Sequence, residues 1–274
     1  MTSEHERQDH HTERILEEAV ARETAVHGRR WAAQYGGYFS DPAVAAPFLD
    51  VIEAGLRAKA PDVLVDLGGG TGFILAELIR RGKLPPGVKL YDMDLSDRQL
   101  ESLPDPRIRP LKSSFLEFQR AAVATATERL MLITRSTLHY AGLAGQKPLL
   151  KHLREQLRPG ELFIHQTACN ARPEDALLVD ELLERLHSDK WLPPLDSLIR
   201  LCEDAGFRVT RVADAPDLAM DEATLADRYG IAPGEMADIR ARLGEAYADS
   251  PRWKATRAGF VVLLGYKILA CEAA

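Results

Sequence analysis

The chain has 274 residues, of which 46% are hydrophobic and 28% charged, a balance that fits a soluble protein with one large domain. Its net charge of −6 at pH 7 and its pI near 5.8 argue against nucleic acid as the main partner. The N-terminus, Met1–His11, is polar, and no apolar run is long enough to span a membrane, so a cytoplasmic protein is expected.

The three cysteines, Cys169, Cys202 and Cys271, are widely separated and show no paired ligand spacing. We therefore expect reduced thiols and no metal site.

The first part of the chain reads as helical. An apolar stripe predicts a helix from about Thr12 to Trp31. An aromatic loop with Tyr35 and Tyr38 follows, and Asp41-Pro42 then starts a second helix that runs toward Lys59, with Asp41 as its cap.

The stretch from Asp62 to Ile74 predicts a strand, a glycine turn and a helix. Val63–Val65 is apolar on both faces, as in a strand of a covered parallel sheet. Glycines follow at 68, 69, 70 and 72, and the helix behind them ends at Gly82. A dinucleotide fingerprint requires Gly-x-Gly-x-x-Gly, but Phe73 occupies the place of the third glycine.

The pattern Asp66-x-Gly68-x-Gly70-x-Gly72 instead resembles motif I of the class I S-adenosylmethionine-dependent methyltransferases. This resemblance implies a Rossmann-like α/β fold with a seven-stranded, mostly parallel sheet whose last strand is antiparallel. It implies S-adenosyl-L-methionine as the cofactor, bound at Asp66, Gly68, Gly69, Gly70 and Gly72. It also implies a core over residues 61–274 beneath a helical N-terminal cap or lid over residues 1–60, although plain packing on the sheet edge remains an alternative for that segment.

The second strand, Val88–Leu95, ends in an acidic residue. Asp94 lies about twenty residues beyond the glycine turn, where a carboxylate can accept bonds from both hydroxyls of a ribose. Ser96–Gln99 is a capping box that opens the next helix and so places Asp94, with Leu95, at the strand end. Asp92 is a competing candidate deeper in the strand.

Two further segments are expected to contact the cofactor. Ser114 stands where the family usually places an acidic residue for the adenine amino group, and Phe115 is a candidate to cover the adenine face or to pack in the core. Arg135, after the fourth strand Leu130–Thr134, is also expected at the cofactor site.

Candidates for the acceptor side follow strands four and five. The segment Arg135–Tyr140 resembles the Leu-His region of small-molecule O-methyltransferases, although Tyr140 replaces a residue that is often acidic. His139 and His165 lie at strand ends and are candidate general bases, because histidine titrates near neutral pH. Tyr35, Tyr38, Tyr140 and Trp191 are candidate substrate contacts, with a packing role as the alternative for each.

The C-terminal part departs most from the family pattern. Residues 213–254 are expected to form an insertion with helices at Glu222–Arg228 and Gly234–Tyr247, between a strand at Phe207–Val212 and a last strand at Gly259–Ile268. The function predicted is methylation of a small molecule in secondary metabolism, on O in the first place, with N or C as alternatives. The expected partner is that small molecule, with a homodimer left open. The alternatives are a non-methylation reaction such as cyclisation or decarboxylation, and a non-catalytic cofactor-binding protein.

Overall fold

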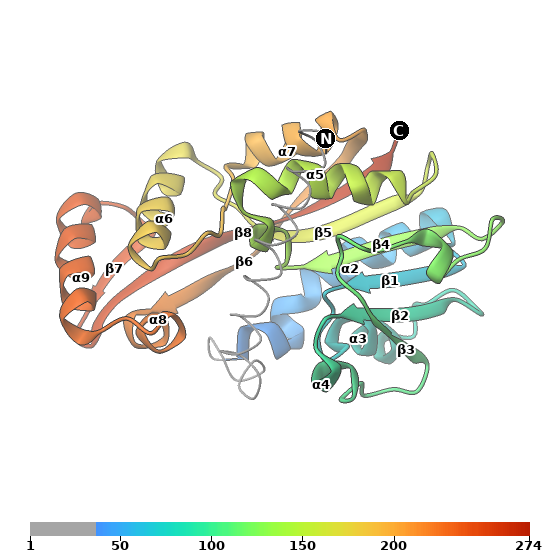
Figure 1. The fold of residues 1–274 in the computed structure, drawn as a ribbon, viewed down its shortest axis with the longest axis horizontal. Helices are drawn as coiled ribbons and strands as arrows, with labels where there is room; N and C mark the ends of the chain where they lie inside the picture. Colours follow the sequence, from blue (N-terminus) through green and yellow to red (C-terminus); the bar gives the residue numbers. More distant parts are fainter. Residues whose placement is uncertain (1–36) are drawn as a thin grey trace, which may run out of the picture.

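The computed structural model describes residues 37–274, so the predicted helix at Thr12–Trp31 and the candidate Tyr35 lie outside the described residues. The described part is a layered α/β structure in which helices cover both faces of one twisted sheet (Figure 1). The helices are α2 (Pro42–Lys59), α3 (Phe73–Arg81), α4 (Asp97–Leu100), α5 (Gly142–Glu155), α6 (Pro173–Arg185), α7 (Leu195–Asp204), α8 (Glu222–Tyr229) and α9 (Pro233–Tyr247), with 3₁₀ turns η2 (Arg120–Ala122) and η3 (Leu138–Ala141).

The strands are β1 (Val63–Leu67), β2 (Lys89–Asp94), β3 (Ile108–Lys112), β4 (Leu130–Arg135), β5 (Leu162–Ala168), β6 (Phe207–Asp221), β7 (Trp253–Thr256) and β8 (Gly259–Ala273). They form the order β3-β2-β1-β4-β5-β8-β6, and β7 pairs with β8 outside this path. Strands β1 to β5 are parallel, and β8 is antiparallel to both of its neighbours. The predicted seven-stranded sheet with an antiparallel last strand is therefore confirmed, with β7 as an additional short strand.

Each face of the sheet buries its own apolar layer. Helices α2 and α3 bring Phe48, Ile52 and Leu75 against Leu64 and Leu90 on one face. Helices α5 and α7 cover the other face. There they pack against the alternate strand residues, such as Val63 and Val65 of β1. Helix α2 begins as predicted, because the amide of Ala43 donates to the Asp41 carboxylate at 2.7 Å and Pro42 occupies the first helical position.

Strands β6 and β8 are much longer than the sequence pattern predicted. Both have 15 residues. They extend beyond the parallel strands β1–β5 to a second apolar cluster, which α6, α8, α9 and β7 cover (Figure 1). The prediction that the sixth strand ends at Val212 was wrong. Its pairing shifts register between Ala215 and Leu218, around Pro216, and then resumes, because a bulge accommodates a residue that lacks an amide donor. The two helices expected in this region are confirmed as α8 and α9.

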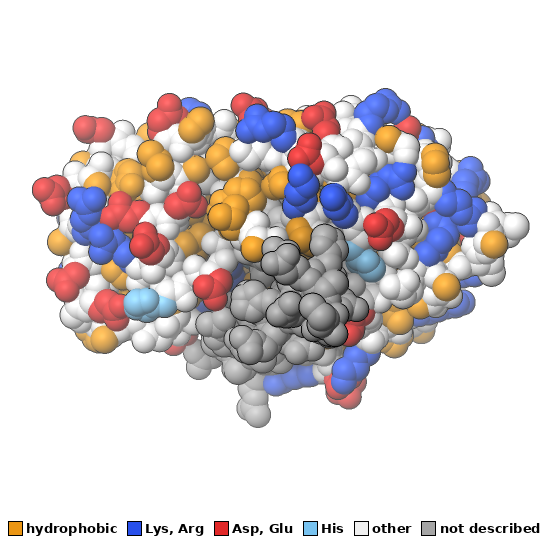
Figure 2. Space-filling view, turned by 45° about the horizontal axis from the view of Figure 1, so that its top comes forward, with side chains coloured by type: hydrophobic (Ala, Val, Ile, Leu, Met, Phe, Trp, Pro, Cys, Tyr) orange, Lys and Arg blue, Asp and Glu red, His pale blue; other side chains and the backbone are white. Residues whose placement is uncertain are grey.

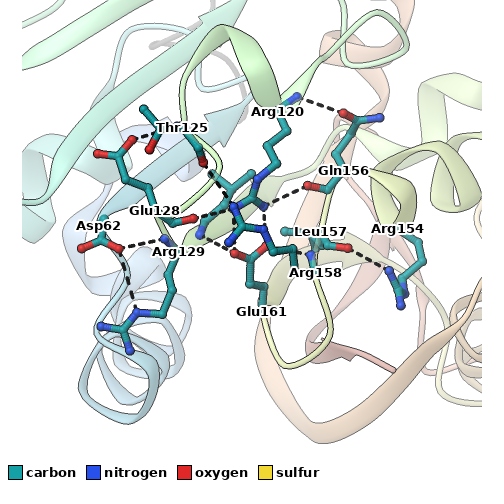
Figure 3. A network of polar contacts seen from close by, with 11 residues as sticks. Asp62, Arg120, Thr125, Glu128, Arg129, Arg154, Gln156, Leu157, Arg158 and Glu161 are labelled. Atoms are coloured by element: carbon teal, nitrogen blue, oxygen red, sulfur yellow. Dashed lines mark hydrogen bonds and ion pairs between the residues drawn. The ribbon is translucent and has the colours of Figure 1, made fainter.

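A buried ion pair supports the edge of the sheet where the parallel strands begin (Figure 3). Arg120 of η2 donates to Glu161 at 2.6 and 2.9 Å, and Glu161 also accepts from the amides of Leu130 and Arg158. These contacts join the starts of β4 and β5, at the opposite edge from the glycine turn.

On the face drawn in Figure 2, acidic and basic side chains are interspersed at the left end of the molecule, whereas Lys and Arg side chains predominate at the right end. Within residues 37–274, none of the helices combines the length and apolar character needed to cross a bilayer.

Candidate cofactor-binding site

The turn after β1 has a backbone that only glycine adopts readily. Gly68, Gly70 and Gly72 have φ angles of +69°, +67° and +72°. The amides of Gly68 and Gly69 both donate to the carbonyl of Met93 in β2, at 2.7 and 3.2 Å. The alternating glycines of the sequence therefore correspond to three left-handed residues, held against the neighbouring strand and leading into α3.

The space around this turn is limited. A Cβ atom on Gly68 would lie 2.7 Å from Cγ2 of Thr137, and one on Gly70 would lie 2.4 Å from Oε1 of Gln99. A ligand at this turn would thus lie against bare backbone, at the strand ends where open parallel sheets bind nucleotide-like ligands.

Asp94 stands at the end of β2, where the sequence placed it. Its carboxylate accepts from the amide of Gly70 at 3.1 Å and from the amide of Ser96 at 2.8 Å. Burial raises its pKa, while the bonds from Ser96 and Gly70 act in the opposite direction. Ser96 caps α4 through the amide of Gln99 as predicted. The carboxylate is therefore oriented next to the glycine turn.

The residues expected around an adenine lie on the loops beside Asp94. Leu95 leaves 37% of its surface exposed, and the amide of Ser113 donates to the carbonyl of Asp94 at 3.3 Å. The hydroxyl of Ser114 accepts from the amide of Leu116, and Phe115 packs on the edge of the core. The structure thus brings Leu95 and the start of the loop with Ser114 and Phe115 to the same strand ends.

Asp66 and Asp92 lie beneath the turn as register partners on β1 and β2. Asp66 is 1% exposed and Asp92 is fully buried, and their carboxylate oxygens have no hydrogen-bond partner among the described residues. Burial raises the pKa of both carboxyls. Two orphaned acids under a tight glycine turn fit a small ligand that carries a cationic group, as S-adenosylmethionine does.

Arg135 at the end of β4 contacts the turn at residues 37–40. It donates to the carbonyls of Phe39 and Tyr38, and its guanidinium lies 5.5 Å from the centre of the Tyr38 ring. Tyr38 itself is 7% exposed, and its hydroxyl donates to the carbonyl of Pro216 at 2.5 Å. These contacts fasten the segment before α2 to the strand ends that carry the site.

His165 does not face the crevice, contrary to the expectation from its place near a strand end. Its ring is fully buried and stacks on Phe163. Nδ1 lies 2.6 Å from Oγ1 of Thr167, and Nε2 lies 3.8 Å from the sulfurs of Cys202 and Cys271. Residues 163, 165 and 167 share the face covered by α5 and α7, so this histidine is placed in the core.

A pocket adjoins the ends of β4 and the long strands. His139 and Tyr140 of η3 line it, with their rings 4.3 Å apart. Trp191 is not among its lining residues, although its amide contacts the carbonyl of His139. The other lining residues come from the turn before α2, the residue after β4, α6 and the loop after it, α8, β6 and β8: Phe39, Ser136, Leu183, Lys190, Leu192, Leu218, Met220, Arg228, Tyr229, Leu264 and Tyr266.

Sequence reasoning missed most of this pocket. Ser136 has a left-handed backbone (φ +62°) and shares a hydrogen bond of 2.7 Å with the Tyr266 hydroxyl. A non-glycine residue in this conformation at a strand end is a feature of functional sites, but nothing in the sequence marks it. Tyr266 was the residue that the sequence could have indicated, because it is a polar aromatic residue just after the apolar run Phe260–Leu264 of the last strand.

A family model described as "Methyltransferase domain" matches residues 43–212 of the chain. No curated protein sequence matches it.

Solved structures with the same fold include a protein from Bacillus halodurans C-125 described as a methyltransferase, at 14% identity and TM-score 0.61, covering 85% of this chain and 99% of that one. The 1,6-didemethyltoxoflavin-N1-methyltransferase of Burkholderia thailandensis has 15% identity and TM-score 0.54, covering 100% and 92%. The [4+2]-cyclase SpnF has 15% identity and TM-score 0.53, covering 83% and 81%.

Proposed function

Because this chain belongs to the class I S-adenosylmethionine-dependent methyltransferases, we propose that it transfers the donor's methyl group to a small organic acceptor held in the pocket beside η3. The observation that carries this proposal is the position of Thr137. Its Cγ2 lies against Gly68 of the glycine turn, while Ser136 and His139 on either side of it line the pocket. The crevice for the donor and the pocket for an acceptor are therefore neighbours.

Such an arrangement fits methyl transfer, which is a displacement in which the acceptor atom must lie in line with the bond that breaks. S-adenosylmethionine supplies a methyl group already activated by its sulfonium. The protein then has to hold both partners and exclude water. In this proposal Asp94 holds the ribose, the glycine turn faces the amino-acid end, and Leu95, Ser114 and Phe115 surround the adenine.

The acceptor class follows from the lining of the pocket. Leu183, Leu218 and Met220 offer apolar surface, and Tyr140 and Tyr229 place aromatic rings 4.9 and 5.2 Å from the ammonium nitrogen of Lys190. We propose an acceptor with an apolar or aromatic body. The Burkholderia enzyme binds 1,6-didemethyltoxoflavin together with S-adenosylhomocysteine, and this likeness supports a small-molecule acceptor.

His139 is the proposed base where the acceptor must lose a proton. It is 6% exposed, lines the pocket and has its ring tilted against that of Tyr140, whereas His165 lies in the core. Residues 1–60 and 213–254 are proposed to cover the site, because residues of both segments, among them Phe39 and Tyr229, reach the pocket. A role in secondary metabolism in the cytoplasm remains part of this proposal.

A transfer assay on the full chain tests the proposal. Labelled S-adenosylmethionine is incubated with panels of phenols, amines and carbon nucleophiles, and methylated product is identified by mass. Met220→Trp fills the pocket and is expected to abolish transfer while donor binding by calorimetry stays unchanged. Leu177→Trp, at a side chain that is 63% exposed, is the matched control and should retain transfer. Absence of binding heat with the donor would refute the proposal.

A second candidate is cyclisation of a small molecule in the same pocket, which the fold likeness to SpnF favours. The same incubation separates the two reactions. Methyl transfer produces S-adenosylhomocysteine in step with product, while cyclisation consumes substrate with the donor intact. Donor binding without either product over the panels would favour a non-catalytic protein.

A further inference from the structure

Asp66 and Asp92 form a close pair at the base of the glycine turn. They are register partners on adjacent parallel strands, so their side chains leave the sheet on the same face. A Cβ atom on Gly69 would lie 2.9 Å from Cγ of Asp66 and 2.8 Å from Cγ of Asp92. Both carboxyl groups therefore lie within 3 Å of the same position, directly beneath the backbone of Gly69.

The pair differs sharply from its neighbour Asp94. Asp94 accepts two backbone hydrogen bonds, whereas the four oxygens of Asp66 and Asp92 have none among the described residues. The charged groups that act on the pair are the carboxylate of Asp94, which opposes ionisation, and the guanidinium of Arg135, which favours it at Asp66. Two dry carboxyls this close cannot both ionise without a cation between them.

The proposed function places a cation close to this pair. S-adenosylmethionine and S-adenosylhomocysteine both carry an α-ammonium group on the amino-acid end, which is the end that the glycine turn is proposed to face. A cation next to the pair favours its ionised form. We propose that Asp66 and Asp92 hold a shared proton in the ligand-free protein and release it when the ammonium group of the cofactor enters the crevice.

The charge balance is simple. While they share the proton, the two carboxyls carry one negative charge, and they carry two once the proton has left a carboxyl O–H for solvent. The ammonium group offsets one of these charges, so the site has the same net charge before and after binding. Affinity for ammonium-bearing ligands therefore rises with pH until the free protein loses the proton unaided. A ligand with the same nucleoside but without the ammonium group gains nothing from this exchange. This inference rests on the proposed cofactor site and goes beyond it, because it gives Asp92 a role in recognising charge.

Calorimetry measures the number of protons that the protein releases when the ligand binds. S-adenosylhomocysteine is titrated into the full chain near neutral pH, in buffers that differ in their enthalpy of ionisation. The slope of the observed enthalpy against that quantity counts the protons released, and we expect about one per ligand bound. Methylthioadenosine, which lacks the amino-acid end, is the matched ligand and should release none. Asp92→Asn should bind S-adenosylhomocysteine without proton release, and Asp97→Asn, at an exposed carboxylate on α4, should behave like the natural chain.

Each outcome decides a separate point. Heat with S-adenosylhomocysteine but no dependence on buffer overturns the shared proton while leaving the methyltransferase proposal intact. Equal release with methylthioadenosine overturns the role of the ammonium group. No heat with either sulfur nucleoside or the donor removes the cofactor site itself. The comparison of the two ligands uses only the natural chain, so it stands even where a variant fails to fold.

Discussion

The amide of Gly70 donates a hydrogen bond to the carboxylate of Asp94, with 3.1 Å between nitrogen and Oδ2. The two residues come from different strand ends and are joined through space across the crevice. Since Oδ1 of the same carboxylate accepts from the amide of Ser96, the side chain is held in one orientation. A carboxylate fixed in this way is prepared to accept the hydroxyls of a ribose at no further cost in side-chain entropy.

Replacing Asp94 by alanine should weaken binding of S-adenosylmethionine by roughly 1–3 kcal/mol, because a charged acceptor is lost and Gly70 loses its partner. Asp94→Asn should fall in between, since its amide oxygen still accepts. Asp97→Ala is the control, as Asp97 contacts Lys112 at the surface. Calorimetry measures the three affinities. An unchanged affinity in Asp94→Ala would assign the ribose contact to another residue.

Gly70→Ala should lose cofactor binding, whereas Gly82→Ala should keep it. Both glycines have left-handed backbones, with φ of +67° and +64°, so each alanine should reduce stability by about 1–2 kcal/mol. Only Gly70 has a close neighbour for the new Cβ atom, at 2.4 Å, while nothing lies within 4 Å at Gly82. Thermal unfolding and calorimetry on both variants separate strain from obstruction. Equal binding by both would show that the turn does not contact the cofactor.

The cofactor side of the molecule was the predictable part, because it is encoded locally. Three alternating glycines match three positive φ angles, and Ser96 marks the end of β2 and so the place of Asp94. Such features need only a turn, a strand and a cap, each of which has its own residue preference.

The acceptor pocket was not predictable, because its lining comes from segments that lie far apart in the sequence and come together only in the folded chain. Pro216 indicated the end of a strand, yet β6 continues past it through a bulge. Lys190 and Tyr229 lie far apart in sequence and meet only when β6 and β8 extend to carry α8. His165 illustrates the same limit. An apolar strand buried on both faces does not reveal which residue points toward a crevice and which toward a helix.

Glu161→Gln should destabilise the fold without altering cofactor affinity. Its carboxylate pairs with Arg120 and accepts from the amides of Leu130 and Arg158 in a largely buried setting (Figure 3). Removing its charge leaves the Arg120 guanidinium uncompensated, at a cost of about 3–5 kcal/mol. Urea unfolding measures the loss. Asp204→Asn, which breaks the exposed pair with Lys147, should change stability little, and a comparable loss there would contradict the role given to burial.

Asp92→Asn should make the ligand-free protein more stable, and increasingly so as the pH rises. Burial and the neighbouring carboxylates Asp66 and Asp94 raise the pKa of Asp92 above its value in the unfolded chain. Above that unfolded value, the native state binds more protons than the unfolded state, so stability falls with rising pH until the native group ionises. The slope reaches at most about 1.4 kcal/mol per pH unit for each retained proton.

Urea midpoints over a series of pH values test this sign. The natural chain should lose stability with rising pH more steeply than Asp92→Asn, whose amide has no charge to suppress. Asp105 supplies a control of opposite sign, because hydrogen bonds from Arg107 lower its pKa to about 2. Its contribution is present above the unfolded pKa and is lost as the pH falls toward the folded one. Asp105→Asn should therefore lower stability by a constant amount at neutral pH and alter the slope of the profile only in acid. Parallel profiles for the natural chain and Asp92→Asn would mean that Asp92 is ionised in the ligand-free protein.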